Sequence, residues 1–206
     1  MAETPTARAL TDALQSGRVC LTPTDTLPGL SFDPRIAAAA QRVREIKGRL
    51  SGTGYVSLVE NFASALRWWL DPGPVWKQAL TSLWPAPLTV VFAASPECPP
   101  SLLALDGSVA LRVPAMSNEH AWMYNLLRMI DVPLPTTSVN RHGDAPCVDW
   151  EGAARFAVGA GVFVPPHTGE IPLGVASTII RITAPSAFIE IRAGAVASDT
   201  IRSHLK

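Results

Sequence analysis

The chain has 206 residues with 17 basic and 17 acidic side chains, so its formal net charge is zero. A neutral chain has no overall electrostatic field that would hold it on nucleic acid or on an anionic membrane, and any such contact would need a local patch. Charged residues make up 17% of the sequence against an ordinary value of about 25%, which favours a compact domain over a disordered scaffold.

Three cysteines, Cys20, Cys98 and Cys147, are odd in number and far apart. This spacing argues against a disulfide framework and against structural zinc, and it favours a reducing cytoplasm. The N-terminus lacks the basic and apolar regions of a targeting signal, and proline interrupts the most apolar later stretch, residues 83–94. We therefore expect a soluble cytoplasmic protein without a membrane contact, folded as a single domain over residues 1–206.

The N-terminal part of the chain alternates a helix, a strand and a second helix. Apolar residues at helical spacing predict a helix over Thr6–Ser16, and a buried strand at Val19–Leu21 follows. Asp33 is predicted to cap the second helix, which ends at Gly48. Lys47 therefore lies at a helix exit, outside the apolar pattern of the core.

A loop rich in hydroxyl groups, Thr22–Thr26, joins the first strand to the second helix. Loops that leave a buried strand commonly carry function. Asx and threonine turns between prolines also explain such a cluster, and for this loop alone they are the better explanation. Other segments must therefore decide whether the loop binds a ligand.

The middle of the chain continues the alternation of helices and strands. Trp68 and Trp69 fall at the end of a predicted helix and are expected in the core. The predicted elements are a helix capped by Asn61 that runs through Leu70, a helix at Val75–Leu83, and strands at Tyr55–Val59, Leu88–Ala93 and Val109–Val113.

Arg112 is the charged member of the last of these strands. A buried, unpaired guanidinium is costly, so Arg112 must pair with a carboxylate, extend its charged end to water, or meet an anionic ligand at the strand end. Pairing and ligand binding are about equally favoured, because a guanidinium fork fits either partner.

The C-terminal part is richer in strands. The predicted elements are helices at Asn118–Ile130 and Trp150–Val158, strands at Leu134–Val139, Gly161–Val164, Ser177–Ile182 and Phe188–Ile191, and a loop at His167–Gly174. Interleaved helices and strands without a repeat predict an α/β class, and the strand-rich end predicts a mixed sheet. We therefore expect a twisted open mixed sheet flanked by helices.

Polar groups gather at three predicted strand ends, while phosphate-loop, dinucleotide, serine-hydrolase and zinc-protease motifs are missing from the sequence. The hydroxyl and amide groups belong to Thr24, Thr26, Ser138, Asn140, Ser177 and Thr178, and the basic groups to Lys47, Arg49, Arg112 and Arg192. If these groups converge, they form a pocket for an anion and a polyol. Without a nucleophile paired to a base, such a pocket would act by positioning and by neutralising charge, as phosphoryl and nucleotidyl transfer largely require.

The same segments resemble, in order, those of the YrdC-like family of threonylcarbamoyl-adenylate synthases, the TsaC type. PTDTLPGL at Pro23–Leu30 resembles the family's PTDT-x-Tyr-Gly-Leu, and IKGR at Ile46–Arg49 resembles its Lys-x-Arg. Five further matches are LWPAPLTVVF at Leu83–Phe92, VALRVP at Val109–Pro114, TSVNRHGDAP at Thr137–Pro146, STII at Ser177–Ile180 and IRAGAV at Ile191–Val196. Each match is weak alone, but their shared order is specific and spans nearly the whole chain.

This resemblance implies a YrdC-like α/β fold and a nucleotidyltransferase. The enzyme would make threonylcarbamoyl-AMP and pyrophosphate from L-threonine, bicarbonate and ATP, for tRNA modification. By the family's pattern, threonine would be held by Thr26, Arg112, Thr136 and Ser177. ATP would be held by Lys47, Arg49, Ser138, Asn140 and Arg192, with Lys47 and Arg49 acting in catalysis by neutralising phosphate charge. Mg²⁺ would arrive with the nucleotide rather than in a metal site of the protein, and the product would pass to tRNA threonylcarbamoyl-transfer proteins.

The chain departs from the family's pattern at several positions that bear on its substrate. Proline stands at Pro28 where the family has tyrosine, and the others are Leu50 for proline, His142 for serine, and Ala176 and Arg181 where proline and aspartate are common. One alternative is therefore a YrdC-like paralogue with an altered substrate. His142 is itself open to two interpretations, a ligand contact or a solvated loop histidine.

The basic segment Arg35–Arg49 suggests an alternative of another class. It carries five positive charges against one, Glu45. Such a run is usually a solvated helix face, but it also allows an RNA-binding module or a weak RNA contact beside an enzymatic site.

Overall fold

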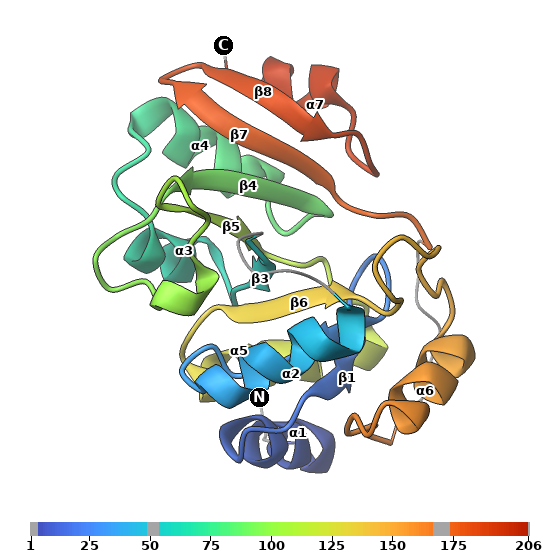
Figure 1. Ribbon diagram of the computed structural model, residues 1–206. Coiled ribbons are helices and arrows are strands. Elements are labelled where there is room, and N and C mark those ends of the chain that lie inside the picture. The colour runs from blue at the N-terminus through green and yellow to red at the C-terminus, as the bar shows by residue number, and fades with distance from the viewer. Residues whose placement is uncertain (1–3, 49–53, 167–173, 206) are drawn as a thin grey trace.

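The computed structural model describes residues 4–48, 54–166 and 174–205. One eight-stranded sheet runs through it in the order β1-β2-β6-β3-β5-β4-β7-β8 (Figure 1). Its strands are β1 (Cys20–Thr22), β2 (Gly29–Ser31), β3 (Val56–Leu58), β4 (Leu88–Ala93), β5 (Ser108–Arg112), β6 (Leu134–Ser138), β7 (Thr178–Ala184) and β8 (Ala187–Arg192). The β3–β5 and β4–β7 pairs are parallel and the other pairs antiparallel, which confirms the predicted mixed sheet.

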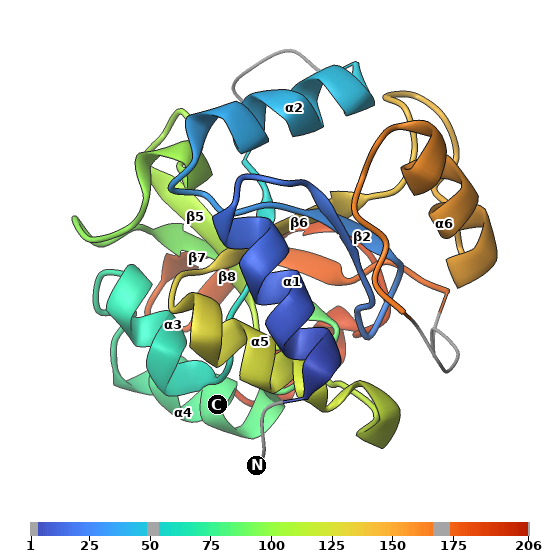
Figure 2. The same cartoon turned by 90° about the horizontal axis from the view of Figure 1, so that it is seen from below.

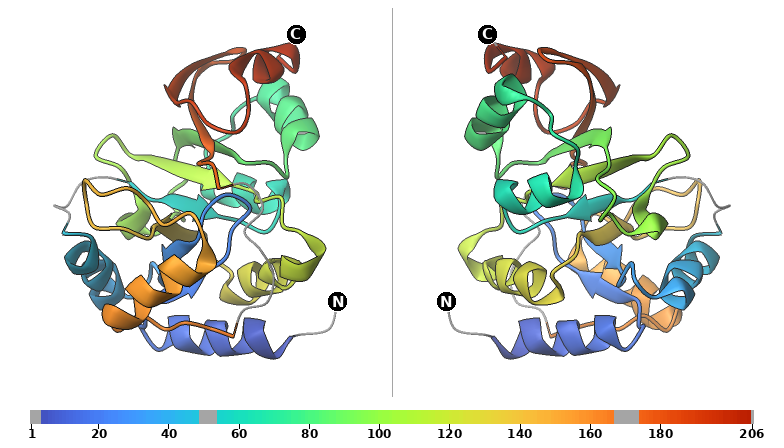
Figure 3. Two further views of the ribbon diagram at one scale, coloured as in Figure 1. Left: turned by 90° about the vertical axis from the view of Figure 1, so that its right-hand side faces the viewer. Right: turned by 90° about the vertical axis from the view of Figure 1, so that its left-hand side faces the viewer.

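Helices pack on both sides of this sheet (Figure 3). The helices are α1 (Pro5–Gln15), α2 (Ala37–Lys47), α3 (Phe62–Trp68), α4 (Pro74–Leu83), α5 (Trp122–Ile130), α6 (Trp150–Gly159) and α7 (Ser198–Ser203). None of the helices in the described ranges is long and apolar enough to cross a membrane.

Three groups of buried apolar side chains hold these elements together. Helix α1 packs against α5 (Figure 2), and the two share a core with Leu58 of β3 and Leu134 of β6. Helices α2 and α6 pack in a second group with β1 and β2. The third group joins α3 and α4 to β4, β5 and β7, and it contains the buried Trp68 and Trp69 as predicted.

Two helix ends form for the reasons that the sequence indicates. The Asn61 side chain accepts a hydrogen bond of 2.9 Å from the backbone N–H of Ser64, so it caps α3. Gly48 ends α2 in the left-handed region with φ of 63°, where glycine has no steric penalty.

Two predicted helix starts are wrong. Helix α2 begins only at Ala37, and Asp33 instead accepts hydrogen bonds from the backbone and the guanidinium of Arg35. The Arg35 side chain, two residues away, binds the Asp33 carboxylate, which is then not free to cap the helix. Asn118 opens a short 3₁₀ turn that ends at His120, and α5 begins after it at Trp122.

Other differences concern short elements. Strand β2 and helix α7 lie in segments where no element was predicted, because three and six residues carry little periodicity. The strand predicted at Gly161–Val164 is only an isolated bridge between Phe163 and Cys20. Helix α3 ends at Trp68, before the predicted Leu70. Residues 167–173 of the predicted loop lie outside the described ranges.

Candidate active site

A cavity of about 360 Å³ opens where the ends of β5, β6 and β7 meet the hydroxyl loop after β1. Eight of the nine residues predicted for the site line it, and the ninth, Arg49, lies outside the described residues. The eight are Thr26, Lys47, Arg112, Thr136, Ser138, Asn140, Ser177 and Arg192. They are spread from residue 26 to residue 192, so the fold brings together groups whose proximity the sequence does not show.

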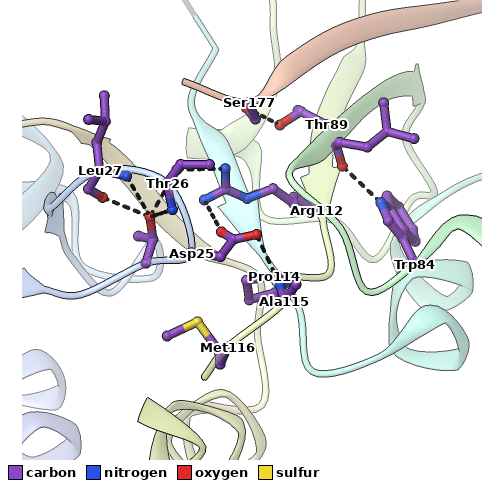
Figure 4. A network of polar contacts seen from close by, with 12 residues as sticks. Asp25, Thr26, Leu27, Trp84, Thr89, Arg112, Pro114, Ala115, Met116 and Ser177 are labelled. Atoms are coloured by element: carbon purple, nitrogen blue, oxygen red, sulfur yellow. Dashed lines mark hydrogen bonds and ion pairs between the residues drawn. The ribbon is translucent and has the colours of Figure 1, made fainter. Parts of the chain in front are cut away.

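The hydroxyl loop is a turn held by hydrogen bonds between its own residues, and it also forms one wall of the cavity. The Thr24 Oγ1 atom accepts hydrogen bonds from the backbone N–H groups of Thr26 and Leu27 at 3.1 and 3.2 Å, and it donates to the Leu27 carbonyl at 2.7 Å. Thr26 Oγ1 accepts a hydrogen bond of 3.1 Å from Nη1 of Arg112 (Figure 4). The turn chemistry expected from the sequence is therefore present, and it presents the Thr26 hydroxyl to the cavity.

Arg112 lies at the end of β5 with only 3% of its surface exposed. Its Nη2 atom is 3.3 Å from Oδ1 of Asp25, which is 2% exposed. Burial lowers the pKa of Arg112, and the neighbouring Asp25 carboxylate opposes that shift. Arg112 therefore pairs with a carboxylate, which is one of the predicted alternatives, and its burial excludes extension of the charged end to water. It also lines the cavity, and its binding of an anionic ligand there stays a prediction.

Lys47 forms the opposite wall, and it is 5% exposed although it closes a surface helix. Its Nζ atom donates to the carbonyl of Ser138 at 2.7 Å and to Oδ1 of Asn140 at 2.5 Å. The backbone N–H of His142 donates to the Lys47 carbonyl at 2.7 Å. Lys47 thus lies at the helix exit as predicted, but tertiary contacts with the end of β6 bury it.

The third wall is built by Ser177 and Arg192. The Arg192 guanidinium donates from Nη2 to the Ser177 carbonyl at 2.7 Å and to the Ser177 hydroxyl at 3.1 Å. The Ser177 hydroxyl also shares a hydrogen bond of 2.9 Å with Thr89 of β4. Burial and, second, the positive charge of Arg112 lower the pKa of Arg192. The two guanidinium groups therefore lie near each other, and an anion bound beside them would stabilise both positive charges.

Charge in the cavity is one-sided. Among the described lining residues, Lys47, Arg112 and Arg192 are cationic and none is a carboxylate. His142 lines the cavity and is exposed, in keeping with a position open both to ligand and to solvent. The described residues contain no group of three or more His, Cys, Asp or Glu side chains that could hold a metal ion. The arrangement suits an anionic ligand with several hydrogen-bonding groups.

Asp25, Gly29 and Thr89 support the site but were not assigned to it from the sequence. Thr89 is a polar residue inside an apolar strand, which is the same signal that drew attention to Arg112, whereas Asp25 lies between two threonines of the hydroxyl loop. Gly29 has no such signal, because the need for glycine comes from Thr136, a residue distant in sequence.

Several described cations of the basic segment have partners within the protein. Arg35 pairs with Asp33, and Arg42 donates to Glu45 and to the carbonyl of Ala160. Lys47 is directed into the cavity. Three of the five cations therefore have partners within the protein.

Comparison with known proteins identifies the family. The family model Sua5_yciO_yrdC, described as Telomere recombination, matches residues 12–194. The chain belongs to this family. The resemblance inferred from the seven segments is confirmed.

Relatives within the Sua5/YciO/YrdC family include named enzymes. The threonylcarbamoyl-AMP synthase of Methylobacillus flagellatus is 32% identical over 163 residues, which cover 79% of this chain and 88% of that relative. The threonylcarbamoyl-AMP synthase of Rattus norvegicus is 29% identical over 203 residues, which cover 96% of this chain and 70% of that relative.

Solved structures of the family share the fold. P. abyssi Sua5 complexed with L-threonine matches with a TM-score of 0.83 and 24% identity, over 96% of this chain and 56% of that chain. E. coli YciO matches with a TM-score of 0.77 and 18% identity, over 95% of this chain and 92% of that chain. The present chain therefore spans little more than half the length of Sua5.

Proposed function

We propose that the chain is an L-threonylcarbamoyladenylate synthase, a nucleotidyltransferase that serves tRNA threonylcarbamoyladenosine modification. It makes threonylcarbamoyl-AMP and pyrophosphate from L-threonine, bicarbonate and ATP. The observation that carries the proposal is the convergence of three cations and several hydroxyl groups, in the family's motif segments, around one cavity. The relatives named as threonylcarbamoyl-AMP synthases support the same activity.

The threonine part of the site comprises Arg112, Thr26, Thr136 and Ser177. Arg112 receives the substrate carboxylate, because a buried guanidinium forms short bidentate hydrogen bonds with a carboxylate. Thr136 Oγ1 is buried without a hydrogen-bond partner in the described residues, so it has capacity for a substrate polar group. Thr26 and Ser177 add hydroxyl groups on either side.

The nucleotide part comprises Lys47, Ser138, Asn140 and Arg192, and by the family's pattern Arg49. Lys47 and Arg192 lie on different walls and would neutralise charge on the phosphates as it shifts toward the leaving pyrophosphate. Lys47 and Arg49 are the proposed catalytic residues. Mg²⁺ would enter with the nucleotide, since oxygen ligands of the phosphates and water suffice for that ion.

The reaction balances in two steps. The threonine amine forms an N–C bond to the bicarbonate carbon, and water leaves, which gives a carbamate. A carbamate oxygen then attacks the α-phosphorus of ATP, and the bond to the β-phosphate bridging oxygen breaks to release pyrophosphate. Both steps need reactants held in order and charge neutralised, which is the kind of catalysis that positioned cations and hydroxyls supply.

The wider setting of the enzyme belongs to the same proposal. The product would pass to tRNA threonylcarbamoyl-transfer proteins, with at most a weak RNA contact by the enzyme, in the cytoplasm. One continuous eight-stranded sheet supports a single domain over residues 1–206.

Pyrophosphate release tests the function directly. With ATP and bicarbonate present, release should depend on L-threonine, and the product should have the mass of threonylcarbamoyl-AMP. A threonine-independent or absent signal at high enzyme concentration would refute the proposal. Pro28 and His142 both line the cavity, so a panel of other amino acids in the same assay tests the altered-substrate paralogue.

Replacing Lys47 by methionine removes a buried ammonium group and leaves the Ser138 carbonyl and the Asn140 amide oxygen without this donor. We expect turnover to fall at least about a hundredfold, in line with the loss of one positioned charge-stabilising donor. The free energy of unfolding should fall by about 1–3 kcal/mol, because buried acceptors lose a partner. Pyrophosphate release and urea unfolding measure the two effects.

Lys77→Met is the matched control, because Lys77 pairs with Asp71 on the surface of α4, away from the cavity. It should retain full turnover. Equal turnover of Lys47→Met and the unaltered protein would remove Lys47 from the catalytic assignment.

A further inference from the structure

Asp25 is a buried carboxylate to which neither the family's pattern nor the proposed reaction gives a role. It lies between Thr24 and Thr26 in the hydroxyl loop and is 2% exposed. Its Oδ2 atom accepts a hydrogen bond of 3.0 Å from the backbone N–H of Ala115, and its Oδ1 atom faces Nη2 of Arg112 at 3.3 Å (Figure 4). A charge held this deep needs a specific reason.

The contact between Asp25 and Arg112 is longer than a charge-assisted hydrogen bond. Charge-assisted N–H···O⁻ hydrogen bonds usually measure about 2.7–2.9 Å. Here Oδ1 of Asp25 makes no hydrogen bond within the described residues, and Nε of Arg112 likewise has none. Asp25 therefore balances the charge of Arg112, and part of the Arg112 guanidinium stays available to donate to another acceptor.

The side-chain contact that links Asp25 to the cavity is the one with Arg112. Thr24, Thr26 and Arg112 line the cavity, whereas Asp25 is not among the lining residues. Two groups thus hold Arg112. The Thr26 hydroxyl lies at the cavity wall, 3.1 Å from Nη1 of Arg112, and the Asp25 carboxylate contacts Nη2 from outside the cavity lining.

The protein fixes Asp25 from the side away from the cavity. The segment after β5 carries Ala115, whose N–H binds Oδ2. The Tyr124 hydroxyl of α5 holds the same segment, because it donates to the Pro114 carbonyl at 2.7 Å and accepts from the Met116 N–H at 3.1 Å. The carboxylate is therefore anchored to the scaffold independently of Arg112, as a group that orients a ligand-binding side chain must be.

We propose that Asp25 is a positioning residue that holds Arg112 in the orientation that binds a substrate carboxylate, and so gives the site its preference for a free α-amino acid. This inference rests on the proposed function, since it assigns Arg112 to the threonine carboxylate. Without the charge of Asp25, the Arg112 guanidinium keeps its contact with Thr26 but loses its ionic partner. The guanidinium can then turn away from the place where the substrate carboxylate binds.

Calorimetric binding to the full chain tests this inference without requiring turnover. The ligands are L-threonine, L-threoninol, which lacks the carboxylate, and ATP. In Asp25→Asn the affinity for L-threonine should fall about tenfold or more, the usual scale for loss of a supporting partner of a binding group. Affinities for L-threoninol and ATP should stay within about twofold, because neither ligand uses the carboxylate position of Arg112.

Asp33→Asn is the matched control, because Asp33 is another buried aspartate, 1% exposed, that pairs with an arginine in a different part of the fold. It should bind all three ligands like the unaltered protein. If Asp25→Asn does not fold, as judged by circular dichroism, Asp25→Glu keeps the charge but displaces it, and the same selective loss of L-threonine affinity is expected.

The outcomes separate this inference from the proposed function. Unchanged or tighter L-threonine binding by Asp25→Asn would show that Asp25 only balances charge, and would overturn the inference alone. An equal loss for all three ligands would also overturn it, since that pattern indicates general damage to the site. Failure of the unaltered protein to bind L-threonine would instead overturn the proposed function.

Discussion

Glycine at positions 29 and 194 serves close packing at the site rather than an unusual backbone angle. Neither residue has a positive φ. A Cβ atom on Gly29 would overlap Oγ1 of Thr136, and one on Gly194 would overlap the backbone of residues 176–178. Gly29 therefore makes room for the Thr136 hydroxyl, and Gly194 lets the chain after β8 approach closely enough for Arg192 to reach Ser177.

Gly29→Ala should displace Thr136 and weaken L-threonine binding about tenfold, because the position of one hydroxyl group changes in a close-packed wall. The overpacked side chain should also lower the free energy of unfolding by about 1–3 kcal/mol. The control is Gly159→Ala at the end of α6, where nothing lies within 4 Å of the added Cβ. That change should be neutral or stabilise the protein by up to about 1 kcal/mol. Equal behaviour of the two variants in calorimetry and urea unfolding would contradict the steric explanation.

Strand register determines which polar groups meet. Antiparallel pairing of β2 with β6 places Gly29 opposite Ser138 and Ser31 opposite Thr136, so the hydroxyl loop lies beside the polar end of β6. Parallel pairing of β4 with β7 places Leu88 opposite Thr178, which brings Thr89 within reach of Ser177. A slip of one residue in either pair would turn these side chains to the other face.

Asp106 ties the connection between the short 3₁₀ helix at Pro100–Leu102 and β5 to the sheet. This carboxylate accepts from the N–H and hydroxyl of Ser108 and pairs with Arg181 of β7. These hydrogen bonds, first that of the Ser108 hydroxyl and then that of Arg181, lower the pKa of Asp106 to about 2.

Because the pKa is lower in the folded protein, Asp106 stabilises the fold at pH above its unfolded value of about 3.9, and this contribution disappears as the pH falls toward 2. Asp106→Asn should therefore be less stable than the unaltered protein at pH 7, by less than about 1 kcal/mol since the pair is solvent-screened. The difference should be much smaller at pH 2, close to the folded-state pKa, and should vanish below it. Urea unfolding at both pH values measures this, and an undiminished difference at low pH would contradict it.

At the scale of the whole molecule, the cavity links parts of the fold that otherwise pack in separate cores. Its lining includes Thr26 after β1, Arg112 of β5 and Arg192 of β8. Each of these elements belongs to one continuous sheet. A ligand in the cavity therefore contacts the N-terminal and C-terminal parts together and should stabilise them as a unit.

L-threonine with ATP should raise the unfolding temperature, because a ligand that binds only the folded state stabilises it by mass action. At a ligand concentration of 100 times Kd, the free energy of unfolding rises by about 2.7 kcal/mol. For a chain of this size this raises the unfolding temperature by roughly 5–11 °C. D-threonine with ATP is the control and should give the shift of ATP alone. Thermal unfolding followed by circular dichroism measures the shift, and equal shifts with both enantiomers would speak against a specific threonine site.

The sequence by itself determined the α/β class, most helix and strand positions, the family and eight of the side chains that line the cavity. It could do so because apolar periodicity, caps such as Asn61 and ordered motifs are local properties of the chain. The burial of Lys47, the pairing of Arg112 with Asp25, the strand at Gly29–Ser31 and the contact of Thr89 with Ser177 were decided only by the tertiary structure. Each of these features depends on contacts between residues far apart in the sequence. Such contacts cannot be recognised from the local sequence around either partner.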